Sequence, residues 1–561
     1  SSRAREAACT AQGDTVRGDF GAFARNAIQR AFAATGAPFA QSAFAHASAV
    51  LDRYSEQLAV QTVAACHGGD DSPRIAAARR ACLAERAAEL VGLVDVLSHA
   101  DAGVVQRAPN AAWAIFDPAP CNDAHVLLEA PAVPRTPEQA AFLGKLRAFD
   151  DAGRYQDGIA LAKPQLDAAR ARGDRDAELD LSLVLGQLDE EVAPPEQIAP
   201  IYERALELAE ASGRDLDAAV ALIRLANLTG SVQHQHAAAH RQLDLARAKL
   251  ARLGGGNVAI RATLLDTEGE VLMDENRLGE AETALREAAK ELAQAYGDDH
   301  PQLGNALGTL SEILRGEGKQ AESLEVSRHT ADVLRRALGD EHPTVAGAEL
   351  NLATALVWMH RDDEARPLLA HADAVFARTF GDDHPVRAAV YGSLGELERD
   401  QSHWDAAIDA FRKALAVLVK LGDVAGQAGA RGDLARTLSL AGRGDEAVAE
   451  QTKVVAIYEQ LGPDGAPRLP AALADLADID TARGKPALAV PIAERAVALA
   501  EARPADANPD DLADARLALA AALWDAGRDR TRARALAEKA RAAYTDPARV
   551  GRAAQWLADH R

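Results

Sequence analysis

The sequence predicts an all-α protein, a superhelical array of helical hairpins preceded by a small helical domain. Hydrophobic residues make up 48% of the 561 positions but aromatic residues only 4%, so apolar burial depends mainly on Ala, Leu and Val. This composition is typical of closely packed helices rather than of β-sheets. The second observation is an internal period of 40 to 42 residues. Such a period predicts one long repeat array in place of several independent domains.

The charge of the chain excludes one class of function. The chain has 62 Lys and Arg against 84 Asp and Glu, a formal net charge of −22. We therefore expect no nucleic-acid partner, because nucleic-acid binding needs a basic surface. We also expect no cofactor. No stretch reaches the roughly 18 consecutive apolar residues of a membrane-spanning helix, so attachment to a membrane would need a segment absent from this chain.

Glycine residues mark the period. Three of them open related five-residue phrases, Gly-Asp-Asp-His-Pro at 297–301 and 381–385 and Gly-Asp-Glu-His-Pro at 339–343. We interpret Gly as the left-handed end of one helix, the acidic residues as caps of the next helix, and Pro as its first residue. The histidines of the phrases either form a pH-sensing ladder or, as we favour, belong to the loop architecture. The periodic glycines are Gly173, Gly213, Gly255, Gly297, Gly339, Gly381, Gly422 and Gly462.

Between successive glycines lie two segments with helical spacing of apolar residues, joined by a short turn such as residues 317–319. We expect about ten such hairpins over residues 137–547 and a closing helix over residues 548–561. Small residues recur twelve positions apart, where a large side chain would overpack the contact between the two helices of a hairpin. These pairs are Gly269 and Ala281, Ala353 and Ala365, Gly395 and Ala407, Ala435 and Ala447, and Ala477 and Ala489.

This pattern resembles the tetratricopeptide repeat, in the 42-residue form found in kinesin light chains and many bacterial proteins. The best match is Leu394, Gly395, Ala407, Phe411 and Ala414, which reproduces the family's order of small and aromatic residues. The resemblance implies a right-handed superhelix whose concave groove is lined by the first helix of each hairpin. In this family the groove usually receives a peptide or a partner helix.

The expected groove positions follow from counting along each first helix from its small residue. They are mixed in charge but lean acidic, and the alternative for each charge is a solvated face without a ligand. The positions are Asn227, Asp266, Glu270, Asn305, Glu312, Arg315, Thr354, Glu396, Arg399, Arg436, Asp475, Asp478 and Asp514.

Residues 1–130 do not keep the period, contain all four cysteines and have no lysine, so we treat them as a separate helical domain. Apolar spacing predicts its helices near residues 20–34, 41–65, 74–98 and 102–116. A Pro-rich segment at residues 131–136 links this domain to the repeats.

A second resemblance rests on these first 130 residues. The order of Cys9, Ala-Thr-Gly at 34–36, Cys66, Ala-Cys-Leu at 81–83 and Cys-Asn-Asp at 121–123 is similar to a segment of transmembrane serine/threonine protein kinases of the myxobacterial type. In those kinases the segment lies between the membrane helix and the repeats. The resemblance implies that this chain is the extracytoplasmic sensor or scaffold region of a receptor kinase.

The cysteines indicate the cellular compartment in which the chain is found. Four cysteines confined to the first 121 residues favour two structural disulfides, and three connectivities are possible. We expect Cys66 to pair with Cys82, because the two residues flank a turn, which leaves Cys9 to pair with Cys121. The alternative is four reduced cysteines in a cytoplasmic scaffold or peptide-responsive regulator.

We do not expect enzymatic chemistry. The kinase tripeptides Asp-Phe-Gly at 19–21 and His-Arg-Asp at 360–362 stand in the reverse of the kinase order, and no glycine-rich nucleotide loop accompanies them. His234, His236 and His240 have a spacing that can chelate Zn²⁺ or Ni²⁺ and would suit a metal-dependent enzyme, but we favour a solvated turn and helix start. The sequence thus predicts a non-catalytic protein- or peptide-binding module and leaves its ligand and oligomeric state open.

Overall fold

The computed structural model consists of helices joined by short loops, and no strand occurs in the part of the chain that it describes. This confirms the predicted all-α class. The chain divides into two compact units, Ser1–Ala355 (unit 1) and Leu356–Arg561 (unit 2). Within the described part, no helix is both long enough and apolar enough to span a membrane. The described residues are 2–68, 72–115, 118–124, 127, 135–254, 257–502 and 509–561.

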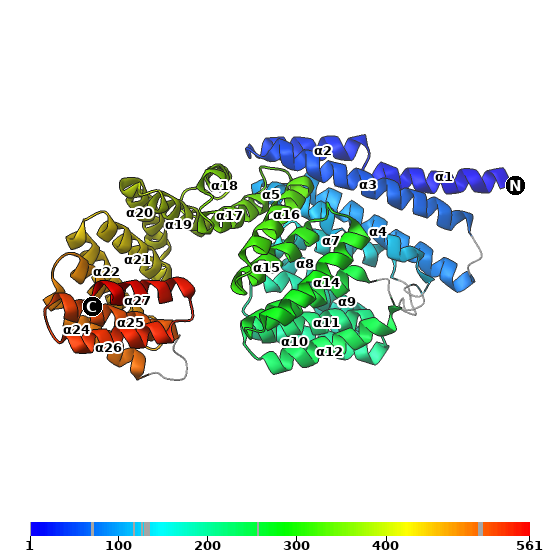
Figure 1. Ribbon diagram of the computed structural model, residues 1–561. Helices are drawn as coiled ribbons and strands as arrows, with labels where there is room; N and C mark the ends of the chain where they lie inside the picture. The colour runs from blue at the N-terminus through cyan, green and yellow to red at the C-terminus, as the bar shows by residue number, and fades with distance from the viewer. Residues whose placement is uncertain are drawn as a thin grey trace. The chain divides into compact units, whose positions relative to one another are not determined.

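In the described residues, unit 1 begins with five α-helices that precede the repeats (Figure 1). The first of them, α1, was not expected from the sequence. Its buried residues Cys9, Gly13 and Val16, with Phe20 directly after its end, form a single stripe at helical spacing, and the stripe packs on α3. The five helices are α1 (Ser2–Asp19), α2 (Ala22–Ala34), α3 (Ala40–His67), α4 (Pro73–Ser98) and α5 (Ala102–Ala114), and the short 3₁₀ turn η1 (Ala119–Asn122) follows.

The cysteines are paired in the structure, but the expected pairing is wrong. Cys9 is bonded to Cys66 and Cys82 to Cys121, with Cα–Cα distances of 5.4 and 5.6 Å. Cys66 lies at the end of α3, whereas Cys82 lies nine residues beyond the start of α4 at Pro73. Nine residues of helix rise about 13 Å, so Cys82 is too far from the turn to reach Cys66. Helix α1 supplies the partner for Cys66 instead.

The repeat region forms helical hairpins, as predicted. Ten pairs of helices run from α7 to α26 in the described residues, and α27 (Pro547–Asp559) closes the array. The proposed linker at residues 131–136 lies largely outside the described residues, so the predicted domain boundaries stay predictions. The paired helices are α7 (Pro137–Asp151) and α8 (Tyr155–Arg172), α9 (Arg175–Glu190) and α10 (Pro195–Ser212), α11 (Asp215–Asn227, extended by the π-helical turn η2, Leu228–Val232) and α12 (His236–Arg252), α13 (Val258–Asp274) and α14 (Leu278–Tyr296), α15 (Pro301–Gly316) and α16 (Gln320–Leu338), α17 (Pro343–Trp358) and α18 (Asp362–Phe380), α19 (Pro385–Asp400) and α20 (Trp404–Leu421), α21 (Val424–Leu440) and α22 (Gly444–Gln460), α23 (Leu469–Ala482) and α24 (Pro486–Glu501), and α25 (Pro509–Asp525) and α26 (Arg530–Ala543).

The glycines of the five-residue phrases are required by their backbone conformation. Gly297, Gly339 and Gly381 have φ of 80°, 89° and 78° with ψ of −179°, 154° and −169°. This region is open essentially to glycine alone, and it differs from the left-handed helical region expected. The helix-ending glycines Gly173 and Gly422 do adopt the left-handed conformation, whereas Gly255 lies outside the described residues.

The histidines of the same phrases cap the following helices, a role that we expected of the acidic residues. The Nδ1 atoms of His300, His342 and His384 accept the backbone N–H two residues later at 3.3, 3.2 and 3.3 Å. An imidazole nitrogen accepts a hydrogen bond only when it carries no proton. The recurrence of these histidines therefore has a structural reason in the loop architecture.

The turn inside most hairpins contains a residue with positive φ, and the turn between α9 and α10 is the exception. This turn position holds glycine in several repeats, but His234 (φ 53°), His360 (φ 54°) and Ser402 (φ 59°) occupy it elsewhere. A non-glycine residue there costs on the order of 1 kcal/mol. From α11 onward the position is filled by His234, Asn276, Gly318, His360, Ser402, Gly442, Gly484 and Gly527.

The small residues lie at tight contacts, as their spacing predicted. A Cβ atom added to Gly395 would lie 2.7 Å from the Phe411 ring, and Ala407 is fully buried. The space beside Gly395 is thus filled by the aromatic residue of the second helix. In the hairpin of α15 and α16, Ser311 and Ser323 take the two small positions, with their Oγ atoms 3.2 Å apart.

Within unit 1, the first helices pack closely on the repeats. Helix α4 crosses α7 where Gly92 meets Gly144, so closely that a Cβ on Gly92 would lie 2.9 Å from the Gly144 backbone. Further along the array, the indole N–H of Trp113 on α5 donates to the Ala337 carbonyl at 3.1 Å. The Nε2 of His342 lies 3.0 Å from the carbonyl oxygen of Gln106, also on α5.

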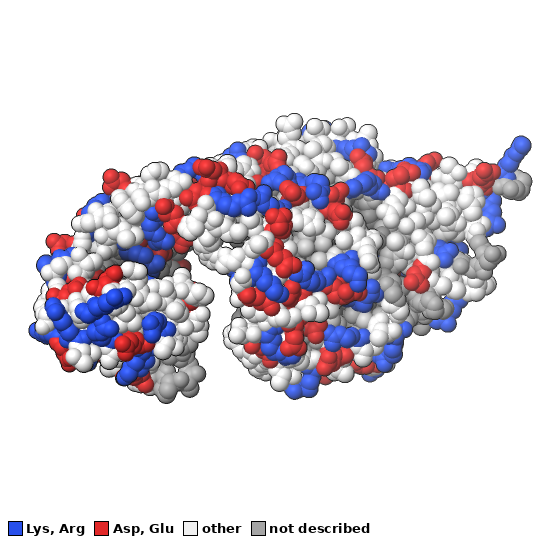
Figure 2. Space-filling view, viewed as in Figure 1, with Lys and Arg blue, Asp and Glu red and all other residues white. Residues whose placement is uncertain are grey.

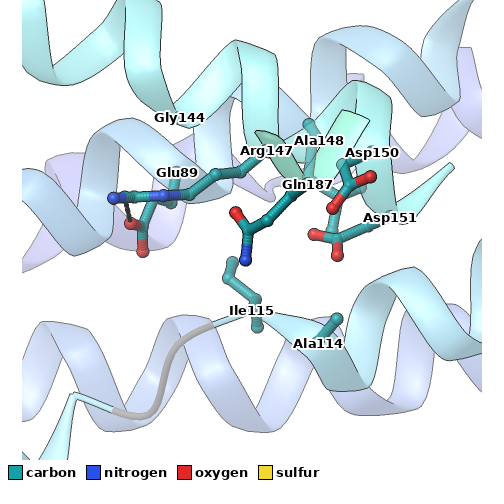
Figure 3. A pocket seen from close by; sticks show the side chains of 10 residues that line it. Glu89, Ala114, Ile115, Gly144, Arg147, Ala148, Asp150, Asp151 and Gln187 are labelled. Carbon is teal, nitrogen blue, oxygen red and sulfur yellow. Dashed lines mark hydrogen bonds and ion pairs between the residues drawn. The ribbon is translucent and has the colours of Figure 1, made fainter. Parts of the chain in front are cut away.

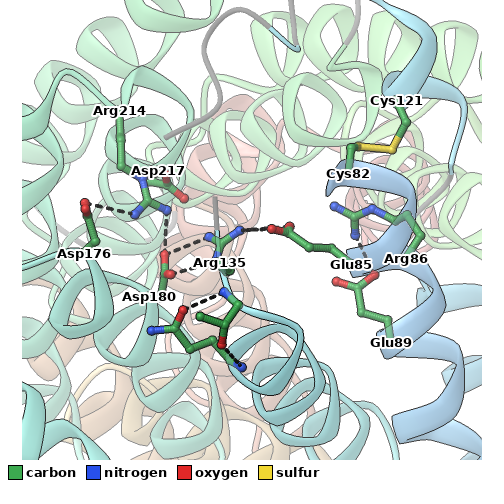
Figure 4. A network of polar contacts seen from close by, with 12 residues as sticks. Cys82, Glu85, Arg86, Glu89, Cys121, Arg135, Asp176, Asp180, Arg214 and Asp217 are labelled. Carbon is green, nitrogen blue, oxygen red and sulfur yellow. Dashed lines mark hydrogen bonds and ion pairs between the residues drawn. A yellow bond between two sulfur atoms is a disulfide. The ribbon is translucent and has the colours of Figure 1, made fainter. Parts of the chain in front are cut away.

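Arg135 links α4 to the second hairpin through a buried charge network (Figure 4). Its guanidinium binds both carboxylate oxygens of Asp180 on α9, at 2.7 and 2.9 Å. The same guanidinium donates to both oxygens of Glu85 on α4, at 3.0 and 2.9 Å. Asp180 also accepts from Arg214 at 2.6 Å, and Arg214 in turn binds Asp217. Because each charge has an opposite partner, this network can be buried at low net cost.

Candidate binding surface

A cavity of about 70 Å³ lies where α4 and α5 meet α7 and α9 in unit 1. Asp150 and Asp151 lie on one side of it and Gln187 faces its centre, while Glu89 and Arg147 form an ion pair on the other side (Figure 3). Ligand-binding pockets usually enclose at least about 300 Å³. The cavity is therefore too small to bind a peptide ligand.

The two adjacent carboxyl groups at this cavity are costly to ionise. Burial raises the pKa of Asp150 to about 6, although the positive charge of Arg224 opposes the shift. Burial, followed by the negative charges of Asp150 and Glu89, raises the pKa of Asp151 well above its usual range. The charged form of both groups is thus disfavoured at this junction, where the first helices pack on the repeats.

Seven of the predicted groove positions lie in unit 1. Asp266 and Glu270 are half-buried one turn apart on α13, where burial raises both pKa values, that of Glu270 to about 7. Thr354 donates to the Leu350 carbonyl of its own helix at 2.9 Å. The remaining positions are half-buried or exposed, and they are Asn227, Asn305, Glu312 and Arg315.

The other six predicted positions lie in unit 2, and their electrostatic interactions place several of them on one face of successive first helices. We call Glu396, Arg399, Asp433, Arg436, Asp475, Asp478 and Asp514 the acidic face of unit 2. Glu396 on α19 and Asp475 on α23 both interact with Asp433 on α21, and Asp475 and Asp478 both interact with Asp514 on α25. The acidic face therefore extends over four consecutive hairpins.

Asp475 and Asp478 have the most distinctive environment on this face. Both remain accessible to solvent, and no Lys, Arg or His nitrogen of the described chain lies within 4.0 Å of either carboxylate. Neighbouring helices exclude part of the surrounding water, and this raises both pKa values. Burial raises the pKa of Asp478 to about 7, and the negative charges of Asp475 and Asp514 add to the shift, although the positive charge of Arg552 opposes it.

Asp514, in contrast, already has partners. Its carboxylate accepts from the Tyr544 hydroxyl at 2.8 Å and binds Arg549 at 2.7 Å and Arg552 at 2.5 Å. Two of these partners come from α27, so the closing helix neutralises one end of the acidic face. Asp514 is the predicted groove residue with the least capacity to bind a ligand.

Sequence reasoning missed three residues of this surface. Asp433 lies two positions before the small residue Ala435, as Asp475 does before Ala477, so the same count could have found it. Trp358 has an exposed fraction of 45% and hydrogen-bonds to Glu396, but it follows no acidic pattern. Arg552 lies on α27, outside the repeat period, and nothing in its neighbourhood in the sequence indicated a contact with α25.

The surface around these residues is mixed in charge. In Figure 2, basic and acidic side chains alternate over the visible face of both units, and no large area of a single sign is seen there. Unit 2 contains many local ion pairs of this kind, such as Lys420 with Asp383 at 2.7 Å and Arg495 with Glu459 at 2.6 Å. Among the described residues Asp475 and Asp478 have no such ion pair, although Arg436 and Arg552 lie close enough to influence their pKa values, and the pair therefore departs from the local pattern.

The three histidines considered as metal ligands are only partly brought together. His234 and His236 both contact Asp274, whereas His240 contacts Glu275 at 2.8 Å. His234 lies in the turn between α11 and α12, and His236 and His240 lie at the start of α12, beside the end of α13.

Sequence comparisons agree with the repeat architecture. Sequence models of the tetratricopeptide repeat match residues 344–418, and also residues 303–344 and 427–461. No curated protein sequence matches the chain.

Several solved structures are similar to parts of the chain. The repeats of a putative kinesin light chain from Podosopora anserina are 24% identical, with a TM-score of 0.33, over 36% of this chain and 95% of that chain. BtubC (BKLC) from P. vanneervenii is 22% identical, with a TM-score of 0.37, over 41% of this chain and 92% of that one. The apo form of RapI is 13% identical, with a TM-score of 0.48, over 64% of this chain and 97% of its own. Together with the paired helices, the family matches show that residues 303–418 and 427–461 consist of tetratricopeptide repeats.

Proposed function

We propose that this chain is a non-catalytic interaction module whose acidic face in unit 2 binds a basic peptide segment of a partner protein. The observation that carries the proposal is the pair Asp475 and Asp478. Both carboxylates are accessible to solvent, and neither has a cationic partner within ion-pair distance among the described residues. A Lys or Arg side chain of a ligand would supply the missing charge.

The physical argument rests on what ionisation costs on this face. Two neighbouring carboxylates repel each other, and the surrounding helices reduce their hydration, so their charged forms are disfavoured. A bound cation removes the repulsion and favours ionisation. The exposed indole of Trp358 adds an aromatic surface beside Glu396. Aromatic residues are enriched at the energetically important positions of protein interfaces.

The proposal implies a defined pH dependence. Because the pKa of Asp478 is raised to about 7, the free-energy cost of ionising it is absent below its ordinary pKa, grows as the pH rises and is complete above about pH 7. A basic ligand needs the ionised form, so it binds with release of a proton. Affinity is therefore expected to increase between about pH 6 and about pH 8, and to decrease with ionic strength.

The experiment uses the full chain and a fluorescent Lys- and Arg-rich peptide library, with binding measured by anisotropy. The variant Asp475→Lys/Asp478→Lys should lose binding and keep the helicity of the parent, because exposed charges contribute little to folding. The matched control is Asp405→Lys/Asp409→Lys on α20, the second helix of a hairpin in the same unit, where both carboxylates are exposed. It changes the net charge equally and should keep binding.

Two results would refute the proposal. Equal loss of affinity in both double variants would show that only the net charge of the chain attracts the peptides. Unchanged affinity of the Asp475→Lys/Asp478→Lys variant would remove these residues from the binding surface.

The location of the module is a further part of the proposal. Two disulfides that pair all four cysteines support an extracytoplasmic location, because disulfides persist in oxidising compartments. Attachment to a receptor kinase stays a prediction from the sequence alone, and a cytoplasmic scaffold is the alternative. Non-reducing peptide mapping of the protein from its native compartment distinguishes the two, because four free thiols would favour the cytoplasm.

A further inference from the structure

Two histidines and a carboxylate converge at the junction between two hairpins of unit 1. The Nδ1 atom of His234 and the Nε2 atom of His236 each lie 2.7 Å from the same oxygen, Oδ2 of Asp274. The three potential donor atoms lie within 4.8 Å of one another. Around a tetrahedral zinc ion the donor atoms are about 3.3 Å apart, as follows from bonds of 2.0–2.1 Å. Small side-chain rotations are sufficient to place an ion between them.

The backbone explains why these side chains meet. His234 occupies the left-handed turn position between α11 and α12, and His236 begins α12, so the two rings project from one turn. Asp274 is the last residue of α13, the first helix of the next hairpin. The exposed fractions of the three side chains are 66% for His234, 25% for His236 and 35% for Asp274, so an ion from solvent can reach them.

The sequence alone suggested a different set of ligands, namely His234, His236 and His240, the last two on one face of a helix. In the structure His240 is engaged elsewhere, because its Nε2 contacts Glu275 at 2.8 Å and lies 3.4 Å from the guanidinium of Arg277. A cationic side chain at that distance disfavours a metal ion on His240. The ligand set is therefore His234, His236 and Asp274, which leaves a coordination position for water.

An equivalent junction in unit 2 shows which part of the arrangement is ordinary repeat architecture. His360 has the same left-handed conformation, and its Nδ1 contacts Asp400 at 3.1 Å, forty residues later, as His234 contacts Asp274. Asp362 occupies the position of His236 there. The His–Asp contact is thus shared by both junctions, and the second imidazole distinguishes the junction in unit 1.

We propose that His234, His236 and Asp274 form a binding site for a divalent transition-metal ion of the zinc class, which clips the hairpin of α11 and α12 to α13. Two imidazoles and one carboxylate are a donor set that suits Zn²⁺, Ni²⁺ and Co²⁺ better than Mg²⁺ or Ca²⁺, which take oxygen donors. The clip joins two consecutive repeats, so the ion stabilises the folded array and not the separate helices. The site is independent of the acidic face in unit 2.

The test is isothermal titration calorimetry of the full chain, purified without a histidine tag, with ZnCl₂ and in parallel with MgCl₂. The parent is expected to bind about one equivalent of Zn²⁺ at this site and to show a higher midpoint of thermal unfolding in its presence. His236→Ala and Asp274→Asn should each remove that equivalent. With CoCl₂, the parent should give the visible d–d absorption of a low-symmetry site, and these variants should not.

The matched controls are His360→Ala and Asp400→Asn, which remove the equivalent His–Asp contact in unit 2 and should keep the zinc equivalent. Circular dichroism of every variant verifies that the helices are intact. The proposal is overturned if the parent takes up no Zn²⁺, if the ion survives His236→Ala, or if the control variants lose it equally. Loss with His240→Ala but not with His234→Ala would also overturn it, because the ion would then occupy the pair on α12.

Discussion

The buried histidine caps of unit 1 predict a loss of stability in mild acid. His342 has an exposed fraction of 7%, its Nδ1 caps α17, and its Nε2 faces the Gln106 carbonyl. Burial lowers its pKa from the ordinary 6.5 to about 4, and the nearby His46 contributes to the shift. The neutral ring therefore stabilises unit 1 above about pH 6.5, and this contribution is lost as the pH falls toward about 4.

The magnitude follows from the two pKa values. For a group that titrates at 6.5 in the unfolded chain and at about 4 in the folded one, linkage gives a loss of about 2 kcal/mol at about pH 5 and about 3 kcal/mol at about pH 4. His300, which is 8% exposed and whose pKa burial also lowers to about 4, contributes a similar loss. Asn is among the best N-cap residues, so His342→Asn removes the titrating ring and keeps a cap.

The assay is urea unfolding followed by the fluorescence of Trp113, the single Trp of unit 1, after the four tryptophans of unit 2 are replaced by Phe. The ring of Trp113 packs 5.0 Å from that of His300, so its emission reports on this part of unit 1. Between about pH 7.5 and about pH 5, the parent should lose about 2 kcal/mol more than His342→Asn. The equivalent His384→Asn variant in unit 2 should follow the parent. Equal pH dependence of the parent and His342→Asn would refute the reasoning.

Three further predictions concern packing and pairing. Gly395→Leu should destabilise unit 2 by about 1–3 kcal/mol in calorimetric unfolding, because the new side chain meets the Phe411 ring, and an unchanged transition would contradict the contact. Cys82→Ser/Cys121→Ser should lower the free energy of unfolding by roughly 4 kcal/mol, as expected for a separation of 39 residues, and non-reducing peptide mapping of the parent should yield the linked pair. Arg135→Met should destabilise unit 1 by about 3 kcal/mol in urea, because the half-buried Glu85 loses its cation and the buried Asp180 keeps only Arg214. A variant as stable as the parent would show that Arg135 contributes nothing to stability.

The repeats could be predicted from the sequence because their signals are local. A glycine with positive φ, such as Gly381, and a small residue at a close helix contact, such as Gly395, each reflect a backbone requirement that few residues satisfy. Positions of these two kinds recur along the array with a period of 40 to 42 residues. The hairpins therefore follow from the spacing of a few residues.

The disulfide pairing could not be predicted in the same way, because it depends on packing between distant segments. Helix α1 has a polar sequence with one narrow apolar stripe, and only its docking on α3 brings Cys9 to Cys66. The neutralisation of Asp514 by Arg549 and Arg552 had no sequence signal either, since α27 lies outside the period. That Asp475 has no ion pair among the described residues could be inferred only from the packing of the neighbouring helices.

The turn position with positive φ has a consequence for how such an array diversifies. Most hairpins have one such position, and a side chain there can be held near the end of the next first helix, as His234 is beside Asp274 and His360 beside Asp400. Replacing glycine there costs on the order of 1 kcal/mol, a small loss for a protein with many repeats. Duplication of a hairpin copies this position with the fold, so each copy can acquire its own chemistry while the helices remain unchanged. An array of this kind can therefore gain new sites one junction at a time.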